Sequence, residues 1–219
     1  MKTFASYPVP ARRVRREIVV VNSRFIATLA PVFDVAEAKA FIREMRTEFA
    51  DATHNVPAYL VGYGDSVIAH SSDDGEPSGT AGRPALTVLR GSGLGDVAVV
   101  VTRYFGGTKL GTGGLVRAYT QAVQEVLAHT PRARKVLAHT LMLAVPYPLF
   151  ERVRALIPAR GGEVLDSDFG ADVTMTARLP VENLEALQSA LQELSNGKLQ
   201  AEIVETGVAI VPLAEEAHD

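Results

Sequence analysis

The sequence predicts an α+β protein made of two domains, residues 1–135 and residues 136–219. A length of 219 residues with 47% hydrophobic content is enough for two modest cores. Along residues 1–135, short β-branched runs alternate with segments of helical periodicity. Residues 136–219 read as strand, helix, strand, strand, helix and strand. For the first domain, the pattern predicts one sheet covered by a helical layer.

The first part of this domain contains a strand over residues 23–32 and then a helix. Asp34 is the expected N-cap of the helix, and Glu37 is its reciprocal partner in a capping box. Two strands, 58–63 and 67–70, form a predicted hairpin around the favoured turn Gly64–Asp65. The apolar face of the helix, which must pack on the sheet, consists of Val35, Ala38, Phe41, Ile42, Met45 and Phe49.

The later part contains a short helix that begins near Ser78, a strand over 97–102 and a longer helix. Thr112 is expected to cap the longer helix, whose first amides and positive dipole end then face the glycine-rich turn before it. Its apolar positions are Leu115, Val116, Tyr119, Val123, Val126 and Leu127.

The second domain has clearer boundaries. A strand over 136–145 precedes a helix that Pro148 opens and Gly161 ends. A hairpin of strands 164–169 and 173–179 follows, then a leucine-rich helix that Gly197 closes and a strand over 199–211. The order βαββαβ is ferredoxin-like, and this fold fixes no function by itself.

The segment 103–117 holds five glycines and three basic side chains between the strand and the longer helix. It lacks the Gly-Lys-Ser/Thr ending of a Walker A loop and the third glycine of the dinucleotide fingerprint. We interpret it as a nest for a phosphate or a nucleic-acid backbone. The alternative is a tight connection whose glycines serve sharp turns only. The residues expected to bind are Arg103, Gly106, Gly107, Lys109, Thr112, Gly113, Gly114 and Arg117.

A second segment places Asp73, Asp74 and Glu76 within four residues. Three carboxylates so close together suit a hard cation, so magnesium is one interpretation. Another is an Asp-Gly turn in which Asp74 bonds its own backbone, and in a third Arg83 pairs with these carboxylates so that they orient a basic site. Apart from this magnesium, no cofactor is expected. The residues assigned to this second site are His54, Asp73, Asp74, Glu76, Ser78, Thr80 and Arg83.

No catalytic residue is assigned. The sequence has no Gly-x-Ser-x-Gly elbow, and its histidine pairs lack the helical spacing of a metal site. His54 is the one histidine that we nominate, and its alternative is a structural, hydrogen-bonded role.

The formal net charge of −3 hides an asymmetry. Residues 1–135 carry 17 Lys and Arg against 12 Asp and Glu, while residues 136–219 carry 5 against 13, so the halves are +5 and −8. A basic half favours an anionic partner, although the two halves can also simply attract each other. The sequence has no cysteine, signal peptide or membrane span, so we expect a cytoplasmic protein that does not bind membranes.

The segments 71–84 and 100–119 together resemble the signature of the YigZ/IMPACT family, and 23–26 and 52–59 match it more loosely. The resemblance implies the fold of the second domain of ribosomal protein S-five, a two-layer α/β domain, followed by a ferredoxin-like domain. The eukaryotic relatives are translational regulators that bind an activator of a stress-responsive kinase. They carry an additional N-terminal domain that we do not find in this sequence, so their partner binding is not carried over.

The two folds in tandem also resemble the C-terminal half of the translocating elongation factor, where such domains contact the ribosome. From the basic half and the resemblance, we expect a binding protein for RNA or a ribonucleoprotein surface in translation-related regulation. An enzyme acting on a small phosphorylated or acyl substrate is one alternative, with Asp73, Asp74 or Glu76 as acid, base or metal ligand. A regulatory module whose acidic second domain docks a protein partner is another.

Overall fold

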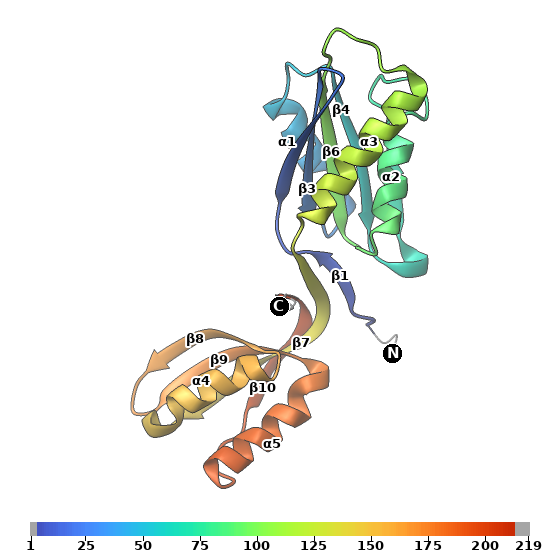
Figure 1. Ribbon diagram of the computed structural model, residues 1–219. Helices are drawn as coiled ribbons and strands as arrows, with labels where there is room; N and C mark the ends of the chain where they lie inside the picture. Colours follow the sequence, from blue (N-terminus) through green and yellow to red (C-terminus); the bar gives the residue numbers. More distant parts are fainter. Residues whose placement is uncertain (1–3, 213–219) are drawn as a thin grey trace, which may run out of the picture. The chain divides into compact units, whose positions relative to one another are not determined.

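The computed structural model describes residues 4–212. Their contacts divide the chain into two compact units (Figure 1): residues 7–134 form the first, and residues 135–211 together with residues 4–6 form the second. None of the described helices is both long and apolar enough to cross a membrane.

The first unit is built on an antiparallel sheet in the order β2-β3-β6-β4-β5. Its central strand β6 is buried at residues 97–103, which explains its nearly uninterrupted run of valines. The strands are β2 (Val14–Val20), β3 (Ser23–Pro31), β4 (His54–Val61), β5 (Ile68–Ser71) and β6 (Val97–Tyr104). A short strand, β1 (Tyr7–Pro10), precedes them.

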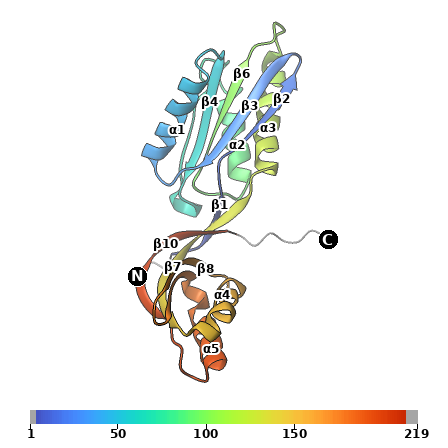
Figure 2. The ribbon, with the colours of Figure 1, turned by 90° about the vertical axis from the view of Figure 1, so that its left-hand side faces the viewer.

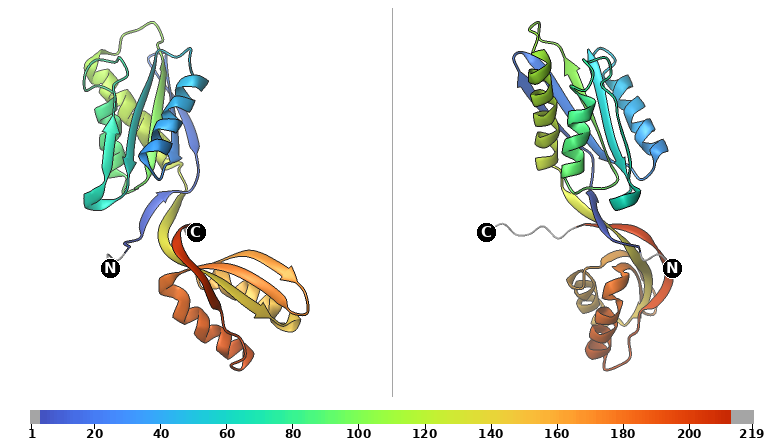
Figure 3. Two further views of the ribbon diagram at one scale, coloured as in Figure 1. Left: turned by 180° about the vertical axis from the view of Figure 1, so that it is seen from behind. Right: turned by 90° about the vertical axis from the view of Figure 1, so that its right-hand side faces the viewer.

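Helices cover both faces of this sheet (Figures 2 and 3). Helix α1 (Val35–Glu48) lies on one face, and helices α2 (Gly82–Gly91) and α3 (Gly111–Ala128) lie on the other. Side chains of β6 alternate between the two cores: Val97, Val99 and Val101 pack with α2 and α3, whereas Ala98 and Val100 pack with α1. The α+β class is confirmed, but helices lie on both faces of the sheet, where the sequence pattern predicted one helical layer.

The predicted start of α1 is confirmed. Asp34 has extended backbone angles, and its carboxylate accepts a hydrogen bond from the Glu37 amide at 2.7 Å. The Glu37 carboxylate in turn accepts one from the Phe33 amide at 2.7 Å, one residue before the cap.

Three details of the first domain differ from the prediction. Strands β4 and β5 pair only as far as Val61 and Ile68, so residues 62–67 form the loop in place of the two-residue turn Gly64–Asp65. Helix α2 begins at Gly82, not near Ser78, because residues 72–81 form a long turn. Strands β1 and β2 were not predicted. β2 is an exposed edge strand, and its arginines interrupt the alternation of apolar and polar residues by which a strand is recognised.

In the sheet of the second unit, β7, β9 and β8 are neighbours in that order, and β10 also pairs with β7. This order confirms the ferredoxin-like βαββαβ prediction. Pro148 lies in a 3-10 helix (Tyr147–Leu149) ahead of α4, so it does not open α4 itself. The elements are β7 (Arg132–Val145), α4 (Phe150–Ala159), β8 (Glu163–Phe169), β9 (Val173–Pro180), α5 (Leu184–Ser195) and β10 (Glu202–Pro212).

Candidate functional site

The two motif segments of the first domain meet at the end of β6. Arg103 pairs in register with Phe25 of β3 and His54 of β4, and its side chain turns into the protein. There, Nη1 lies 2.6 Å from Oε1 of Glu76, and both side chains are almost fully buried. The acidic segment and the glycine-rich segment therefore form one site, joined by a buried ion pair.

Aromatic rings enclose the Arg103 guanidinium. Its carbon lies 5.4 Å from the centre of the Phe25 ring and 5.6 Å from that of Phe105, within the range of cation–π attraction. Nη2 lies 3.4 Å from Oγ of Ser23, while Nε has no hydrogen-bond partner among residues 4–212. Sequence reasoning placed Arg103 among the anion-binding charges. The structure places it beneath the surface, where it supports the loop.

Glu76 is the centre of a hydrogen-bonded cluster. Its Oε1 also accepts a hydrogen bond from the Tyr119 hydroxyl at 2.8 Å. Burial, the charge of Glu76 and this hydrogen bond raise the pKa of Tyr119 far above its ordinary value, so the hydroxyl stays protonated and donates. Sequence reasoning missed Tyr119 because its position on the apolar face of α3 indicated only a core residue.

His54 lies at the rim of this cluster. Its Nδ1 is 2.8 Å from the Asp74 carbonyl oxygen, which can only accept, so Nδ1 carries the proton of the neutral ring. Its Nε2 lies 3.7 Å from Oε2 of Glu76. The two side chains form an ion pair only when the ring is protonated.

Asp73 holds the start of α2. Its Oδ1 accepts hydrogen bonds from the amides of Ala81 and Gly82, and its Oδ2 accepts one from Gly79, at 2.8–3.0 Å. Burial alone would raise the pKa of Asp73. These amides, with Arg83 nearby, outweigh it, so the pKa lies below the ordinary 3.8. The carboxylate acts as a helix cap supplied from eight residues upstream.

Asp74 joins the turn to its neighbours. One oxygen lies 2.5 Å from Nη2 of Arg46 on α1, and the other accepts the Asn55 amide at 2.7 Å. The expected bond from Asp74 to its own backbone is thus replaced by a bond to β4. Elsewhere in the segment, the Thr80 hydroxyl donates to the Pro77 carbonyl at 2.7 Å, whereas Ser78 is exposed.

The carboxylates of this segment therefore have protein partners. Residues 4–212 contain no group of three or more His, Cys, Asp or Glu side chains that could hold a metal ion. Magnesium at Asp73, Asp74 and Glu76 stays a prediction.

Both motif segments line a cavity of about 380 Å³. Arg103, Glu76 and His54 contribute to its lining, as do Lys109 and the first residues of α3. Leu115 and Pro77 add apolar surface, and Phe105 lies at the cavity with 46% of its surface exposed. The cavity thus combines buried charge, an exposed cation and an exposed aromatic ring.

The start of α3 differs from the prediction at Thr112. The helix begins at Gly111, so Thr112 lies in its first turn, and the N-cap residue Leu110 makes no side-chain capping hydrogen bond. Lys109 and Arg117 are exposed, and a Cβ on Gly113 would lie only 3.7 Å from Nη1 of Arg117. Arg117 therefore folds back over the first turn, which contains no acidic residue.

The glycines have different roles. Gly107 and Gly111 have φ of 85° and 70°, which L side chains rarely adopt. A Cβ on Gly106 would lie 2.1 Å from the backbone of Asn22. This glycine therefore allows the backbone at Asn22 to pack closely against the glycine-rich loop. There is less room for a side chain at Gly114 than at Gly113, because a Cβ on Gly114 would lie 3.0 Å from the Leu110 side chain.

The clash at Gly106 gives a direct test. We expect Gly106→Ala to lower the free energy of unfolding by about 1–3 kcal/mol, because the strand turn at Asn22 must move. Gly113→Ala is the matched control: it lies in the helix and its Cβ would make only an ordinary contact, 3.7 Å from Nη1 of Arg117, so it should be neutral or stabilise by up to about 1 kcal/mol. Urea denaturation compares the two. Equal stabilities would contradict the assigned packing role.

A second test concerns the buried ion pair. Glu76→Ala should cost about 3–5 kcal/mol, because it leaves the Arg103 charge buried and unpaired. Replacing the cluster with Arg103→Met, Glu76→Leu and Tyr119→Phe should cost less, since no buried charge or hydroxyl then lacks a partner. Denaturant midpoints measure both. A triple variant less stable than the single one would argue against this account.

A third test uses pH. Because the folded-state pKa of Asp73 is depressed, its stabilisation is present above pH 3.8 and is lost as the pH falls through the folded pKa. Asp73→Asn should cost about 1–3 kcal/mol at neutral pH and progressively less below pH 3.8. Asp65→Asn, at an exposed position, is the control. A wild-type advantage that stays constant down to acid pH would disprove the capping role.

Comparison with known proteins assigns the chain to a family. The Impact N-terminal domain matches residues 21–127, and a domain of unknown function, DUF1949, matches residues 143–198. The IMPACT family member YigZ of Escherichia coli (strain K12) is 38% identical over 201 residues, covering 91% of this chain and 98% of that protein.

An IMPACT family member of Haemophilus influenzae is 38% identical over 205 residues, covering 93% of this chain and 100% of the other. A crystal structure of a hypothetical protein, also 38% identical, covers 92% of this chain and 98% of its own with a TM-score of 0.61. Identity above one third over nearly the whole length, with both domains matched, shows that the chain belongs to the IMPACT family.

Proposed function

We propose that the first unit binds RNA or a ribonucleoprotein surface through the glycine-rich loop, in translation-related regulation. The observation that carries this proposal is the unbalanced charge at the start of α3. Lys109 and Arg117 are exposed there beside a helix N-terminus whose N-cap residue, Leu110, makes no side-chain capping bond and whose first turn contains no acidic residue. The positive end of the helix dipole adds to the charges of both cations. Three separate contributions therefore stabilise an anion at this place.

An exposed aromatic ring at the cavity favours nucleic acid over a free phosphate. Phe105 is exposed and lines the same cavity as Lys109, and the Arg103 guanidinium, 5.6 Å from the centre of its ring, is fixed by Glu76. Single-stranded RNA binds proteins by stacking its bases on such rings while basic side chains hold its phosphates. The positive charge of residues 1–135 supplies the long-range attraction.

The cellular setting is part of the proposal. The IMPACT resemblance supports translation-related regulation, and the absence of cysteine agrees with the reducing cytoplasm. Under this proposal, the ribosome or a ribosome-associated complex is the partner that presents the RNA.

A second candidate function follows from the His54–Glu76 pair beside the cavity. An imidazole nitrogen 3.7 Å from a buried carboxylate can exchange a proton with a small ligand bound in the 380 Å³ space. Under this alternative, the protein is an enzyme for a small phosphorylated or acyl compound. Saturable thermal shifts with phosphorylated metabolites, lost in His54→Ala, would favour it over RNA binding.

The RNA proposal is tested with Lys109→Ala/Arg117→Ala, which leaves the buried Arg103 in place. Each phosphate contact to a single strand contributes about 0.7 to the slope of log affinity against log salt, so the slope should fall by about 1.4. Binding of a labelled single-stranded oligoribonucleotide and co-sedimentation with ribosomes at low and high salt measure this. Arg12→Ala/Arg90→Ala removes two exposed charges elsewhere and is the control. An unchanged salt slope in the loop variant would place the contact elsewhere.

A further inference from the structure

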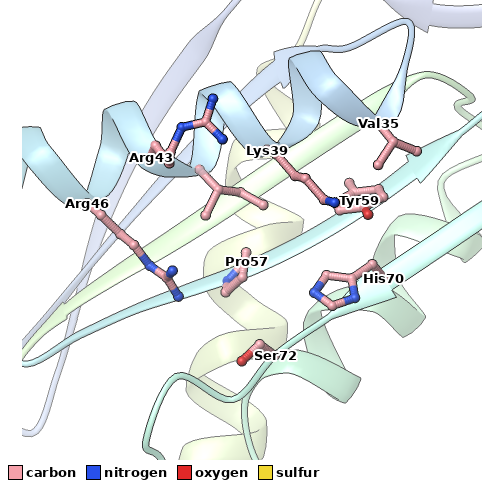
Figure 4. A pocket seen from close by; sticks show the side chains of 9 residues that line it. Val35, Lys39, Arg43, Arg46, Pro57, Tyr59, His70 and Ser72 are labelled. Carbon is pink, nitrogen blue, oxygen red and sulfur yellow. The ribbon is translucent and has the colours of Figure 1, made fainter.

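A second groove lies on the opposite face of the sheet, between α1 and strands β4 and β5 (Figure 4). Its volume is about 540 Å³. Lys39, Arg43 and Arg46 reach it from α1, while Tyr59, His70 and Ser72 face it from the sheet side. Sequence reasoning assigned no function to these residues.

The two flanks of α1 carry opposite charges. Glu37, Glu44 and Glu48 lie at spacings of seven and four residues, so they share one side of the helix. All three are engaged: Glu37 at the cap, Glu44 with Arg13 and Glu48 with Arg15, each pair through two hydrogen bonds of 2.6–2.8 Å. The hydrogen bonds from these arginines lower the pKa of Glu44 and of Glu48.

The other flank of α1 is basic. Arg46 pairs with Asp74, but the Lys39 and Arg43 side chains have no ion-pair partner within residues 4–212. The acids of their own helix lie on the far flank and are already bound, Glu37 at the cap and the other two to Arg13 and Arg15. The groove therefore presents two exposed cations that the described protein does not neutralise, with a third beside them.

The floor of the groove is apolar and aromatic. Ile42 and Pro57 are buried, and the Tyr59 ring, which is 5% exposed, lies 5.3 Å from the His70 ring at a tilt of 32°. His70 is exposed on β5, the edge strand of the sheet. A planar ring supported from behind by a second ring is a platform on which a nucleic-acid base can stack.

The turn after β5 connects this groove to the cavity at the glycine-rich loop. Ser72 lines the groove, and Glu76 and Pro77 line the cavity. Between them, Asp74 binds Arg46 on the groove side, and its backbone carbonyl binds His54 on the cavity side. The two hollows are therefore neighbours separated by a few residues of one turn.

We infer that the α1 groove is a second contact for the same single-stranded RNA, whose backbone passes over the 72–77 turn from the glycine-rich loop to Lys39 and Arg43. This inference rests on the proposed function. Along the helix axis, Lys39, Arg43 and Arg46 are about 6 and 4.5 Å apart, so the cations form a line that suits a linear polyanion. The exposed His70 ring favours RNA over an acidic peptide, because a base stacks on it and a carboxylate does not.

Anisotropy of a labelled single-stranded oligouridylate tests the groove with Lys39→Ala/Arg43→Ala. Both residues are exposed on a helix, where alanine is well tolerated. We expect weaker binding and a salt slope lower by about 1.4, as two phosphate contacts are lost. Arg12→Ala/Arg90→Ala should retain the wild-type slope. His70→Ala should weaken binding about five-fold or more with no change in slope, since stacking releases no counterions.

The outcomes separate the two proposals. If the Lys109/Arg117 variant loses affinity and the Lys39/Arg43 variant does not, the groove inference is overturned while the loop site stands. If only the Lys39/Arg43 variant loses affinity, the groove stands and the loop is not the site. Displacement of the oligouridylate by polyglutamate of equal charge, at the same concentration, would overturn the RNA assignment and indicate an acidic protein segment. Absence of wild-type binding would overturn both proposals.

Discussion

The buried ion pair between Arg103 and Glu76 is the constraint on which the first unit depends. Two charges removed from water stabilise a protein only when they satisfy each other and their remaining hydrogen bonds are made. Here Tyr119 donates to the same carboxylate and the Phe25 ring lies against the guanidinium. These groups come from β3, β6, α3 and the turn after β5, so the pair fixes how four separate segments meet.

This fixed centre explains why the surrounding surface is available for binding. Because Arg103 balances Glu76, neither charge is left to neutralise the cations above them. Asp73 is occupied by the amides of α2, and Asp74 by Arg46 and β4. The acidic segment thus acts within the protein, and Lys109 remains exposed at the cavity. Nearby carboxylates do not by themselves make a site acidic when each already has its partner.

Helix α1 follows the same rule on the other face of the sheet. Its acidic side is bound to Arg13, just before β2, and to Arg15 of β2, and this leaves Lys39 and Arg43 as unpaired charges at the groove among residues 4–212. Exposed ion pairs contribute little to stability, but they decide which charges remain for a ligand. The α3 start and the α1 groove are therefore two places where positive charge of residues 1–135 remains exposed.

The sequence by itself determined the α+β class, the Asp34 cap, the β6 strand and the βαββαβ order, because periodicity and capping act between residues close in the chain. Tertiary structure alone decided that Arg103 is buried, that the Tyr119 hydroxyl donates a hydrogen bond to Glu76 and that the two motif segments share a cavity. The groove at Lys39 could not be predicted from the sequence either. Such contacts join residues tens of positions apart, and the pairing register of the sheet places them together, which no local pattern encodes.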